Sequence, residues 1–209
     1  MADVSVAKEN ILKRIRKALT NSVPLPFPGS EGKQSVYHPP ADEDAIVFAE
    51  EFTKIQGKFA FCTNEQDLVQ QIGLLFKEKD WSKIYCKDEQ FSKLLHIESF
   101  PDLANCDVSI TGCEYLVART GSIVLSTAQV GGRTASVYAP IHICIAYNSQ
   151  LVFDVEDALA FIKQKYKDQF PSFITFATGP SRTADIEKTL VTGVHGPKEV
   201  YCFLIENTP

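Results

Sequence analysis

From residue 42 onward, segments with helical periodicity alternate with short apolar segments rich in β-branched and aromatic residues. The helical pattern fits residues 43–56, 64–79, 88–96 and 154–169, and the strand pattern fits residues 58–62, 83–86, 107–111, 172–178 and 199–206. Such alternation is typical of a sheet that is covered by helices and built from βαβ units. We therefore predict an α/β sandwich of three layers, in the order helix, sheet, helix.

The middle of the chain, residues 114–147, has a different pattern. It is rich in β-branched and aromatic residues and is interrupted by Thr120-Gly121-Ser122 and by a second turn at residues 131–133. This composition predicts successive strands joined by tight turns. We expect some of these strands to pair antiparallel, so that the sheet is mixed. Residues 182–190 are predicted to form a short helix before the last strand.

Residues 1–41 are predicted to be separate from the α/β domain, which is assigned to residues 42–209. Residues 5–20 place their apolar side chains on one stripe and most of their Lys and Arg on the other side, as in an amphipathic helix. Residues 21–42 contain five prolines and two glycines, which is incompatible with a regular element. We expect an extended arm that packs on a surface, and a proline-rich ligand for a partner is the alternative.

The net charge of −5 gives no electrostatic reason to expect nucleic acid or an anionic membrane as a partner. No segment approaches the ~20 consecutive apolar residues that are needed to span a bilayer. The N-terminal residues also lack the apolar centre of a secretory signal. We expect a cytoplasmic protein without a membrane span.

Six cysteines, at positions 62, 86, 106, 113, 144 and 202, lie mostly within apolar runs. No pair is spaced as C-x-x-C, and no His follows a Cys at the distance of zinc ligands. Iron–sulfur sites need convergent thiolates, which are usually close in sequence. We therefore predict reduced, buried thiols that fill the core, and no metal or cluster bound by this chain.

The stretch FATGPSRTADIEKTLVTGVHGP, residues 176–197, is the leading candidate for a functional loop. An apolar strand runs into a polar turn and then into the predicted helix, and the unpaired N–H groups of a helix N-terminus attract anions at such a place. The candidate ligand-binding residues are Gly179, Pro180, Ser181, Arg182, Thr183, Asp185 and Glu187. Arg182 suits a carboxylate or phosphate because its guanidinium can bind two oxygens at once.

The structural alternative for this stretch is an ordinary capped helix. Ser181 or Thr183 would then serve as the N-cap, and Asp185 and Glu187 would complement the helix dipole. The same residue types serve both purposes, so the local pattern leaves the two interpretations open.

Two further groups complete the candidate site. His195 lies in the sequence GVHGP, close to two glycines and a proline, where it is either a base or a hydrogen-bonded structural residue. Thr120, Gly121, Ser122 and Arg133 lie in the two predicted turns of the middle segment, and Arg133 is placed to reach the same cleft. Turn formation and a surface arginine are the alternative for this group. His142 is predicted to point either into the sheet face or into a cleft.

The run TGPSRTADIEKTLVTGVHGPKEVYCFLI, residues 178–205, together with TGSIVL at 120–125 and GGR at 131–133, resembles the LUD domain family, formerly DUF162. The resemblance is closest to the lactate utilization protein C branch and covers residues 42–206. It implies an α/β sandwich with a mixed sheet, similar to the sugar-phosphate isomerase and CoA-transferase group (NagB/RpiA/CoA transferase-like).

The resemblance also implies a function, the oxidation of L-lactate to pyruvate together with two partner proteins that carry iron–sulfur clusters. On this hypothesis the chain is a subunit or accessory factor. It binds a small carboxylate or a partner at a cleft formed by the Thr120 turn, Arg133, the Ser181 loop and His195. A self-sufficient isomerase or transferase that acts on a phosphosugar or a CoA ester is the alternative.

One position departs from the pattern that the resemblance implies. An acidic residue usually precedes Thr-Gly in this family, whereas Arg119 precedes Thr120 here. If that carboxylate works as a general acid or base, Arg119 cannot replace it. Glu114 is the neighbouring carboxylate that would have to compensate, so the candidate catalytic residues are His195 and Glu114.

Overall fold

The computed structural model describes residues 43–184, 190–193 and 195–206 and, nearer the N-terminus, Glu9, Lys13, Arg14 and Lys17. Internal contacts divide the chain into two compact units, residues 1–39 and 40–209. The four described residues of the first unit are helical and exposed. The rest of the predicted N-terminal helix and the predicted arm lie outside the described residues, so a domain division at residues 41 and 42 stays a prediction.

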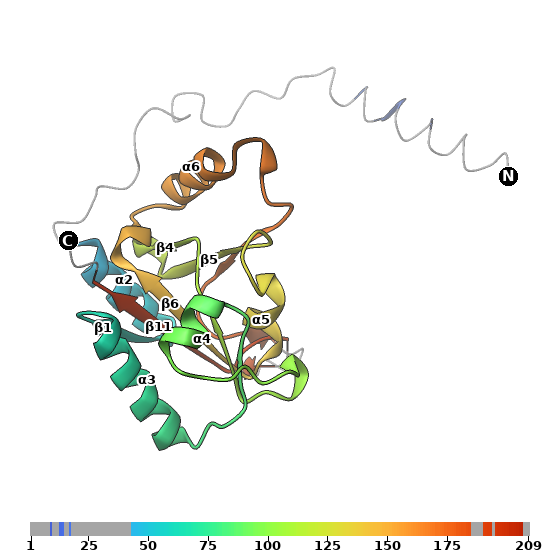
Figure 1. Ribbon diagram of the computed structural model, residues 1–209. Helices are drawn as coiled ribbons and strands as arrows, with labels where there is room; N and C mark the ends of the chain where they lie inside the picture. The colour runs from blue at the N-terminus through green and yellow to red at the C-terminus, as the bar shows by residue number, and fades with distance from the viewer. Residues whose placement is uncertain are drawn as a thin grey trace, which may run out of the picture. The chain divides into compact units, whose positions relative to one another are not determined.

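The larger of the main sheets in the second unit is entirely parallel. Its five strands lie in the order β1 (Lys58–Cys62), β11 (Glu199–Ile205), β6 (Ile141–Tyr147), β3 (Val108–Thr111) and β2 (Ile84–Cys86). Helices α3 (Glu65–Lys79) and α4 (Glu89–Leu94) cover one face of it (Figure 1). Alternate residues along each strand point to opposite faces, so Ile143 and Ile145 pack toward these helices while Cys144 packs on the other side.

A second, mixed sheet has the strand order β7 (Leu151–Val152), β4 (Tyr115–Val117), β5 (Ser122–Ser126) and β8 (Ile174–Ala177). Its β4–β5 and β5–β8 pairs are antiparallel, and its β4–β7 pair is parallel. Helix α6 (Val155–Tyr166) packs over one face through Ala158 and Ile162 (Figure 1). The other face shares a core with α2 (Asp44–Lys54) and with the large sheet, through Leu116, Ile123 and Leu204.

The predicted α/β fold with both parallel and antiparallel pairing is confirmed. The strands are divided differently from the prediction, because the parallel and antiparallel pairs lie in separate sheets. The packing order is therefore helices, parallel sheet, mixed sheet and helix, with α2 contributing to the core between the sheets. The chain leaves the large sheet after β3, builds the β4–β5 hairpin, and returns to the large sheet as β6.

The prediction that residues 132–138 continue the run of strands is wrong. They form helix α5 (Gly132–Tyr138), which begins after Gly131 in a left-handed conformation with φ 85°. Small buried residues, Ala135 and Ala139, let this helix approach the large sheet, where the Ser109 hydroxyl donates a hydrogen bond of 2.6 Å to the Ala135 carbonyl. This contact joins positions that are distant in sequence, which local pattern does not reveal.

The helix predicted at residues 182–190 is also wrong. Strands β9 (Arg182–Ala184) and β10 (Leu190–Thr192) pair antiparallel there, with Val191 opposite Thr183. β-Branched residues at these positions favour extended backbone. Because a strand begins at Arg182, the described part of this segment offers no helix N-terminus for the candidate anion site.

Two glycine turns close on the last turns of α2. Gly121 has φ +59°, and a Cβ built on it would lie 2.6 Å from the backbone nitrogen of Phe52. Gly179 has φ +80°, and a Cβ there would lie 2.6 Å from the carbonyl oxygen of Ile55. In both turns the absence of a side chain permits the backbone to touch the helix, and the left-handed conformation suits glycine.

We predict that Gly121→Ala lowers the free energy of unfolding by more than about 2 kcal/mol, because left-handed backbone strain adds to overpacking. Urea unfolding followed by circular dichroism measures this change. The matched control is Gly73→Ala, inside α3, where an added Cβ meets nothing within 4 Å. It should raise stability by up to about 1 kcal/mol, because alanine has the higher helix propensity. Equal effects of the two substitutions would contradict the packing of Gly121 on α2.

His142 in β6 is 1% exposed, and its Nε2 lies 2.8 Å from the Thr111 hydroxyl. The side chain therefore lies in the protein interior, which decides between the two orientations left open by the sequence. Burial disfavours the charged imidazolium and lowers the pKa of His142 to about 4.

This burial predicts a stability loss in mild acid. The unfolded chain binds a proton at His142 near pH 6.5 and the folded chain only near pH 4, so stability is full above the unfolded pKa and falls between these values. From pH 7 to pH 5 the loss due to His142 should be about 2 kcal/mol. Urea unfolding of the wild type and of His142→Gln at both pH values tests this, because carboxylate contributions are common to both proteins. An unchanged pH dependence in His142→Gln would refute the assignment.

Candidate functional site

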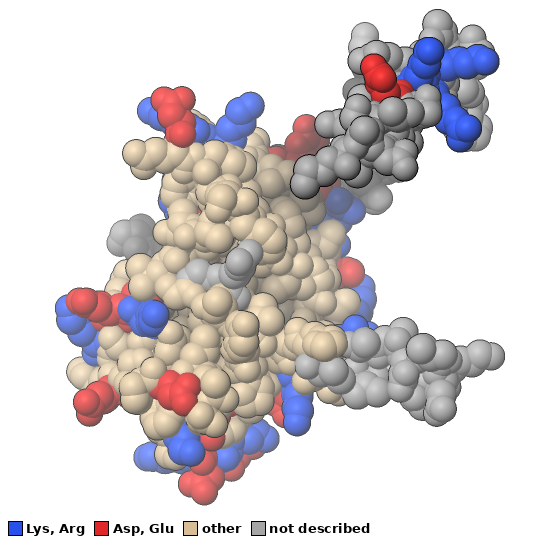
Figure 2. Space-filling view, turned by 90° about the vertical axis from the view of Figure 1, so that its right-hand side faces the viewer, with Lys and Arg blue, Asp and Glu red and all other residues tan. Residues whose placement is uncertain are grey.

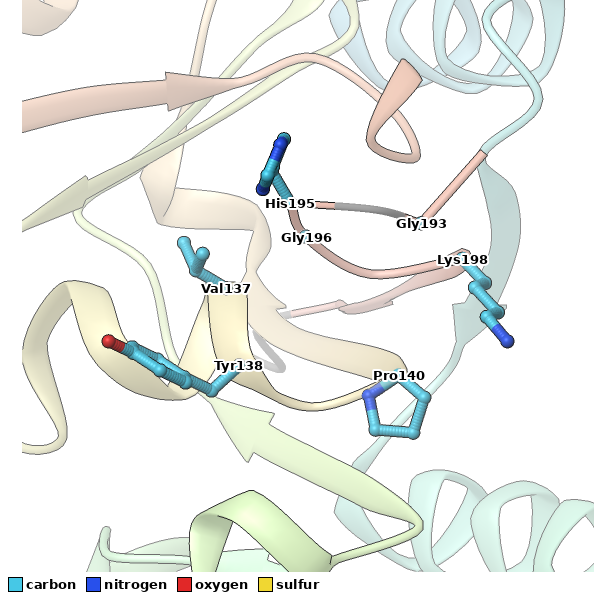
Figure 3. A pocket seen from close by; sticks show the side chains of 7 residues that line it. All are labelled: Val137, Tyr138, Pro140, Gly193, His195, Gly196 and Lys198. Carbon is cyan, nitrogen blue, oxygen red and sulfur yellow. The ribbon is translucent and has the colours of Figure 1, made fainter. Parts of the chain in front are cut away.

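A pocket of about 510 Å³ lies beside the C-terminal end of α5. Its lining consists of Val137, Tyr138, Pro140, Gly193, His195, Gly196 and Lys198 (Figure 3). The first three residues come from α5 and the segment after it, and the other four come from the loop between β10 and β11. The volume falls in the range of ~300–1,000 Å³ that is typical of small-molecule sites. This pocket is the candidate functional site.

The pocket lies at the amino-terminal edge of the parallel sheet. Pro140 directly precedes β6, Lys198 directly precedes β11, and these two strands are parallel neighbours. The Lys198 backbone nitrogen donates to the Pro140 carbonyl at 2.7 Å, so the two segments are joined where the strands begin. Open parallel sheets usually bind ligands at the opposite, carboxyl-terminal edge.

At that carboxyl-terminal edge, the protein's own side chains meet. Tyr147 ends β6, and its hydroxyl donates to Glu65 at 2.9 Å and accepts from Gln90 at 3.1 Å. Glu65 and Gln90 lie in the first turns of α3 and α4. Burial and the Glu65 hydrogen bond raise the pKa of Tyr147 to about 12, so this bridge stays protonated at neutral pH.

The pocket loop is held by the segment that follows β8. The Ser181 backbone nitrogen donates to the Pro197 carbonyl at 2.9 Å, and the Gly193 nitrogen donates to the Ser181 carbonyl at 3.0 Å. The structure therefore brings Ser181 and the loop of His195 together, as the sequence predicted. It does so through backbone pairing, with the Ser181 side chain packed under Gly196.

Two glycines allow this packing. A Cβ on Gly196 would lie 2.8 Å from the Ser181 Cβ. A Cβ on Gly193, whose φ is +79°, would collide with the side-chain carbons of Lys198. Gly193 thus leaves room for the aliphatic stem of Lys198 to cross the loop, and this crossing sets the direction of its amine.

His195 and Lys198 are both exposed, and Lys198 makes no ion pair within the described part of the chain. None of the seven lining residues is acidic. Around the pocket, Val130, Val137 and Tyr138 are 62%, 44% and 68% exposed. Figure 2 looks onto the side where α5 lies in Figure 1, and the charged side chains of the described residues lie mostly toward the margins of that face.

A chain of hydroxyl groups connects two of the predicted motifs. Thr120 Oγ1 lies 2.7 Å from Ser122 Oγ, which lies 2.8 Å from Thr178 Oγ1. This chain joins the Thr-Gly-Ser turn to the segment that leads into Gly179, Pro180 and Ser181. Because Gly121 and Gly179 both pack on α2, the two motifs lie at the end of that helix and do not line the pocket.

Arg182 contacts the same helix end. Its Nη2 donates to the Ile55 carbonyl at 2.8 Å, and Ile55 is the C-cap of α2. A cation is favourable there because the last carbonyls of a helix carry partial negative charge. The other predicted members of this stretch cannot be placed, since Asp185, Glu187 and the side chain of Thr183 lie outside the described residues, as does the side chain of Arg133.

Glu114 is buried within a separate cluster. Its carboxylate accepts hydrogen bonds from Ser126 at 2.5 Å, from Tyr166 at 2.8 Å and from Lys165 at 2.8 Å. Burial would lower the pKa of Lys165, but the hydrogen bond and charge of Glu114 together raise it. These described partners belong to β5 and α6, so the structure does not bring Glu114 together with His195.

Arg119, which departs from the family pattern, binds the start of α6. Its Nε and Nη2 donate to the two carboxylate oxygens of Asp154 at 2.9 and 2.8 Å. Asp154 is the N-cap of α6, and hydrogen bonds from Arg119 lower its pKa below the ordinary range. Arg119 therefore connects the turn before Thr120 to α6.

Sequence reasoning identified His195 but missed Lys198, Tyr138, Val137 and Pro140 as pocket residues. A signal for Lys198 was present, because it directly precedes an apolar strand and lies three residues after His195. The strand prediction for residues 132–138 concealed Tyr138 and Val137, since only the helix α5 brings them beside the loop.

All six cysteines are buried free thiols, as predicted. Among the residues that the structure describes, no group of three or more His, Cys, Asp and Glu side chains is placed to hold a metal ion. No described helix has the length and apolar character required to cross a membrane.

Residues 87–205, more than half of the chain, match the family model of the LUD domain. The chain is 36% identical over 112 residues to lactate utilization protein C of Bacillus licheniformis, an alignment that covers 53% of this chain and 47% of that protein. It is 28% identical over 170 residues to lactate utilization protein C 1 of Bacillus mycoides, covering 69% of this chain and 72% of that protein. The alignment to the first of these relatives thus spans about half its length.

A crystal structure of a DUF162 family protein from Deinococcus radiodurans has a similar fold. The TM-score is 0.58, and the match covers 78% of this chain and 96% of the other. The two sequences are 17% identical, so this likeness concerns the fold alone. Together with the match over residues 87–205, these findings establish that the chain belongs to the LUD domain family.

Proposed function

We propose that this chain takes part in lactate utilization, as a component of the oxidation of L-lactate to pyruvate. The observation that carries this proposal is its 36% identity to lactate utilization protein C of Bacillus licheniformis, supported by membership of the LUD domain family. The pocket beside α5 is the proposed ligand site.

The chemistry of the pocket supports a carboxylate ligand. The Lys198 amine supplies a positive charge that has no acidic neighbour among the lining residues. Val137 and Pro140 provide apolar surface for carbon atoms. His195 is the lining residue that can exchange a proton near neutral pH, because an ordinary imidazole titrates in that range. A small carboxylate can thus meet both a cation and a proton-exchanging group.

We further propose that the iron–sulfur clusters of this oxidation belong to partner proteins, as the family resemblance implies. The chain's own six thiols are buried, mostly in the cores between its sheets and helices. In this arrangement the chain acts as a subunit or accessory factor, and its pocket presents the carboxylate to the assembly.

Deletion of the gene from the organism that encodes it should abolish growth on L-lactate and leave growth on glucose unchanged. Restoration with the wild-type gene should recover growth, whereas His195→Ala and Lys198→Ala should not, because each removes a functional group from the pocket. Lys163→Ala is the matched control, since Lys163 is exposed on α6 and does not line the pocket. It should restore growth fully.

Undiminished growth of the deletion strain on L-lactate would refute the role in lactate utilization. Recovery of growth by both pocket variants would instead refute the assignment of the ligand site. Immunoblots that show equal amounts of each variant keep a folding defect from being mistaken for either result.

A further inference from the structure

The pocket is much larger than a three-carbon acid. Even if each non-hydrogen atom of lactate took a water molecule's share of liquid volume, about 30 Å³, the ion would fill only about 180 Å³. The pocket encloses about 510 Å³. Most of the space is therefore free for a larger ligand than lactate, or for a second one.

The lining groups are also spread across the pocket. In Figure 3 the Tyr138 ring and the Lys198 amine lie on opposite sides, and the His195 ring lies on a third side above Val137. A three-carbon ion that contacts Lys198 leaves the Tyr138 side empty. A ligand that uses the whole lining needs an apolar, preferably flat, part at one end and an anionic part at the other.

The Tyr138 side suits an aromatic ring. Tyr138 is 68% exposed and Val137 is 44% exposed, so a ring that packs on them would remove apolar surface from water. Aromatic side chains provide stacking platforms for nucleobases, which all present a flat face. The His195 imidazole and Pro140 extend the same lining.

The Lys198 side suits a phosphate. Its ammonium acts as a point charge, which is the way lysine commonly binds phosphate. The backbone bonds between Ser181 and the loop fix the loop, and Gly193 accommodates the lysine stem. The cation is therefore positioned before a ligand arrives, which lowers the entropy cost of binding.

We propose that this pocket binds an aromatic ring that carries a phosphate, in the manner of a mononucleotide, with the ring against Tyr138 and the phosphate at Lys198. The proposal rests on the proposed function only in that both use this pocket. The mononucleotide occupies the larger part of the space, and the carboxylate binds beside it.

Calorimetric titration of the full chain with AMP, GMP and UMP tests this proposal. Adenosine lacks the phosphate and ribose 5-phosphate lacks the base, so each isolates one half of the ligand. We expect AMP to bind at least about tenfold more tightly than either, because the charged contact and the stacked ring both contribute.

Two variants separate the ends of the pocket. Lys198→Ala should weaken AMP about tenfold or more through loss of the charge-assisted contact and leave adenosine unchanged. Tyr138→Ala should weaken AMP and adenosine and leave ribose 5-phosphate unchanged. Both side chains are exposed, so wild-type urea midpoints are expected, and Lys163→Ala serves as the control.

Absence of binding by all three nucleotides would overturn the proposal. Binding of ribose 5-phosphate as tightly as AMP would overturn the ring assignment, and AMP affinity unchanged in both variants would overturn the location. Growth on L-lactate reports separately on the proposed function. A strain that depends on the chain for lactate growth while the protein ignores nucleotides refutes this inference alone, and nucleotide binding with lactate growth intact after deletion refutes the proposed function alone.

Discussion

The contact between the last turn of α2 and two glycine turns is the constraint on which the candidate site depends. Gly121 and Gly179 bring their backbones against this turn, and Arg182 donates to the Ile55 carbonyl at its end. These contacts fix the segment after β8. Ser181, in that segment, pairs through its backbone with Gly193 and Pro197. The position of the pocket loop therefore follows from the position of α2, although α2 contributes no pocket residue.

Elements with local signals were predictable from the sequence. Helix α3 begins at Asn64, whose side chain accepts from the Asp67 nitrogen, and α6 begins at Asp154, which forms a capping box with Asp157. Both caps join residues within one turn, so sequence pattern can detect them. The parallel strands were likewise visible as short apolar runs, because burial on both faces removes the alternation of polar residues.

Elements whose structure depends on distant partners were not predictable in this way. The segment of α5 has strand-like composition, yet it is helical where Ser109 and buried alanines hold it on the large sheet. The segment after Ser181 has the residues of a capped helix, yet it pairs as β9 and β10. In each case a contact with a remote part of the chain outweighs weak local propensity. The candidate site shows the same division. His195 was recognisable from its glycine-rich surroundings, whereas Tyr138 and Lys198 meet only when α5 and the start of β11 are placed side by side. Arg182 was misleading, because the donors that bind an anion also satisfy the carbonyls of a helix end.

The two edges of the parallel sheet explain why the pocket lies where it does. At the carboxyl-terminal edge, Tyr147 bridges the first turns of α3 and α4, so the helix ends that commonly receive ligands are occupied by a protein side chain. At the amino-terminal edge, Pro140 and Lys198 stand where β6 and β11 begin, and a short helix and a glycine-rich loop enclose the space beside them. Binding at this edge depends on side chains such as Lys198 and Tyr138, since the N-termini of α3 and α4 lie at the other edge. The chemistry of the site is consequently set by a few substitutable residues on a loop and one helix, while the sheet beneath them supplies only their positions.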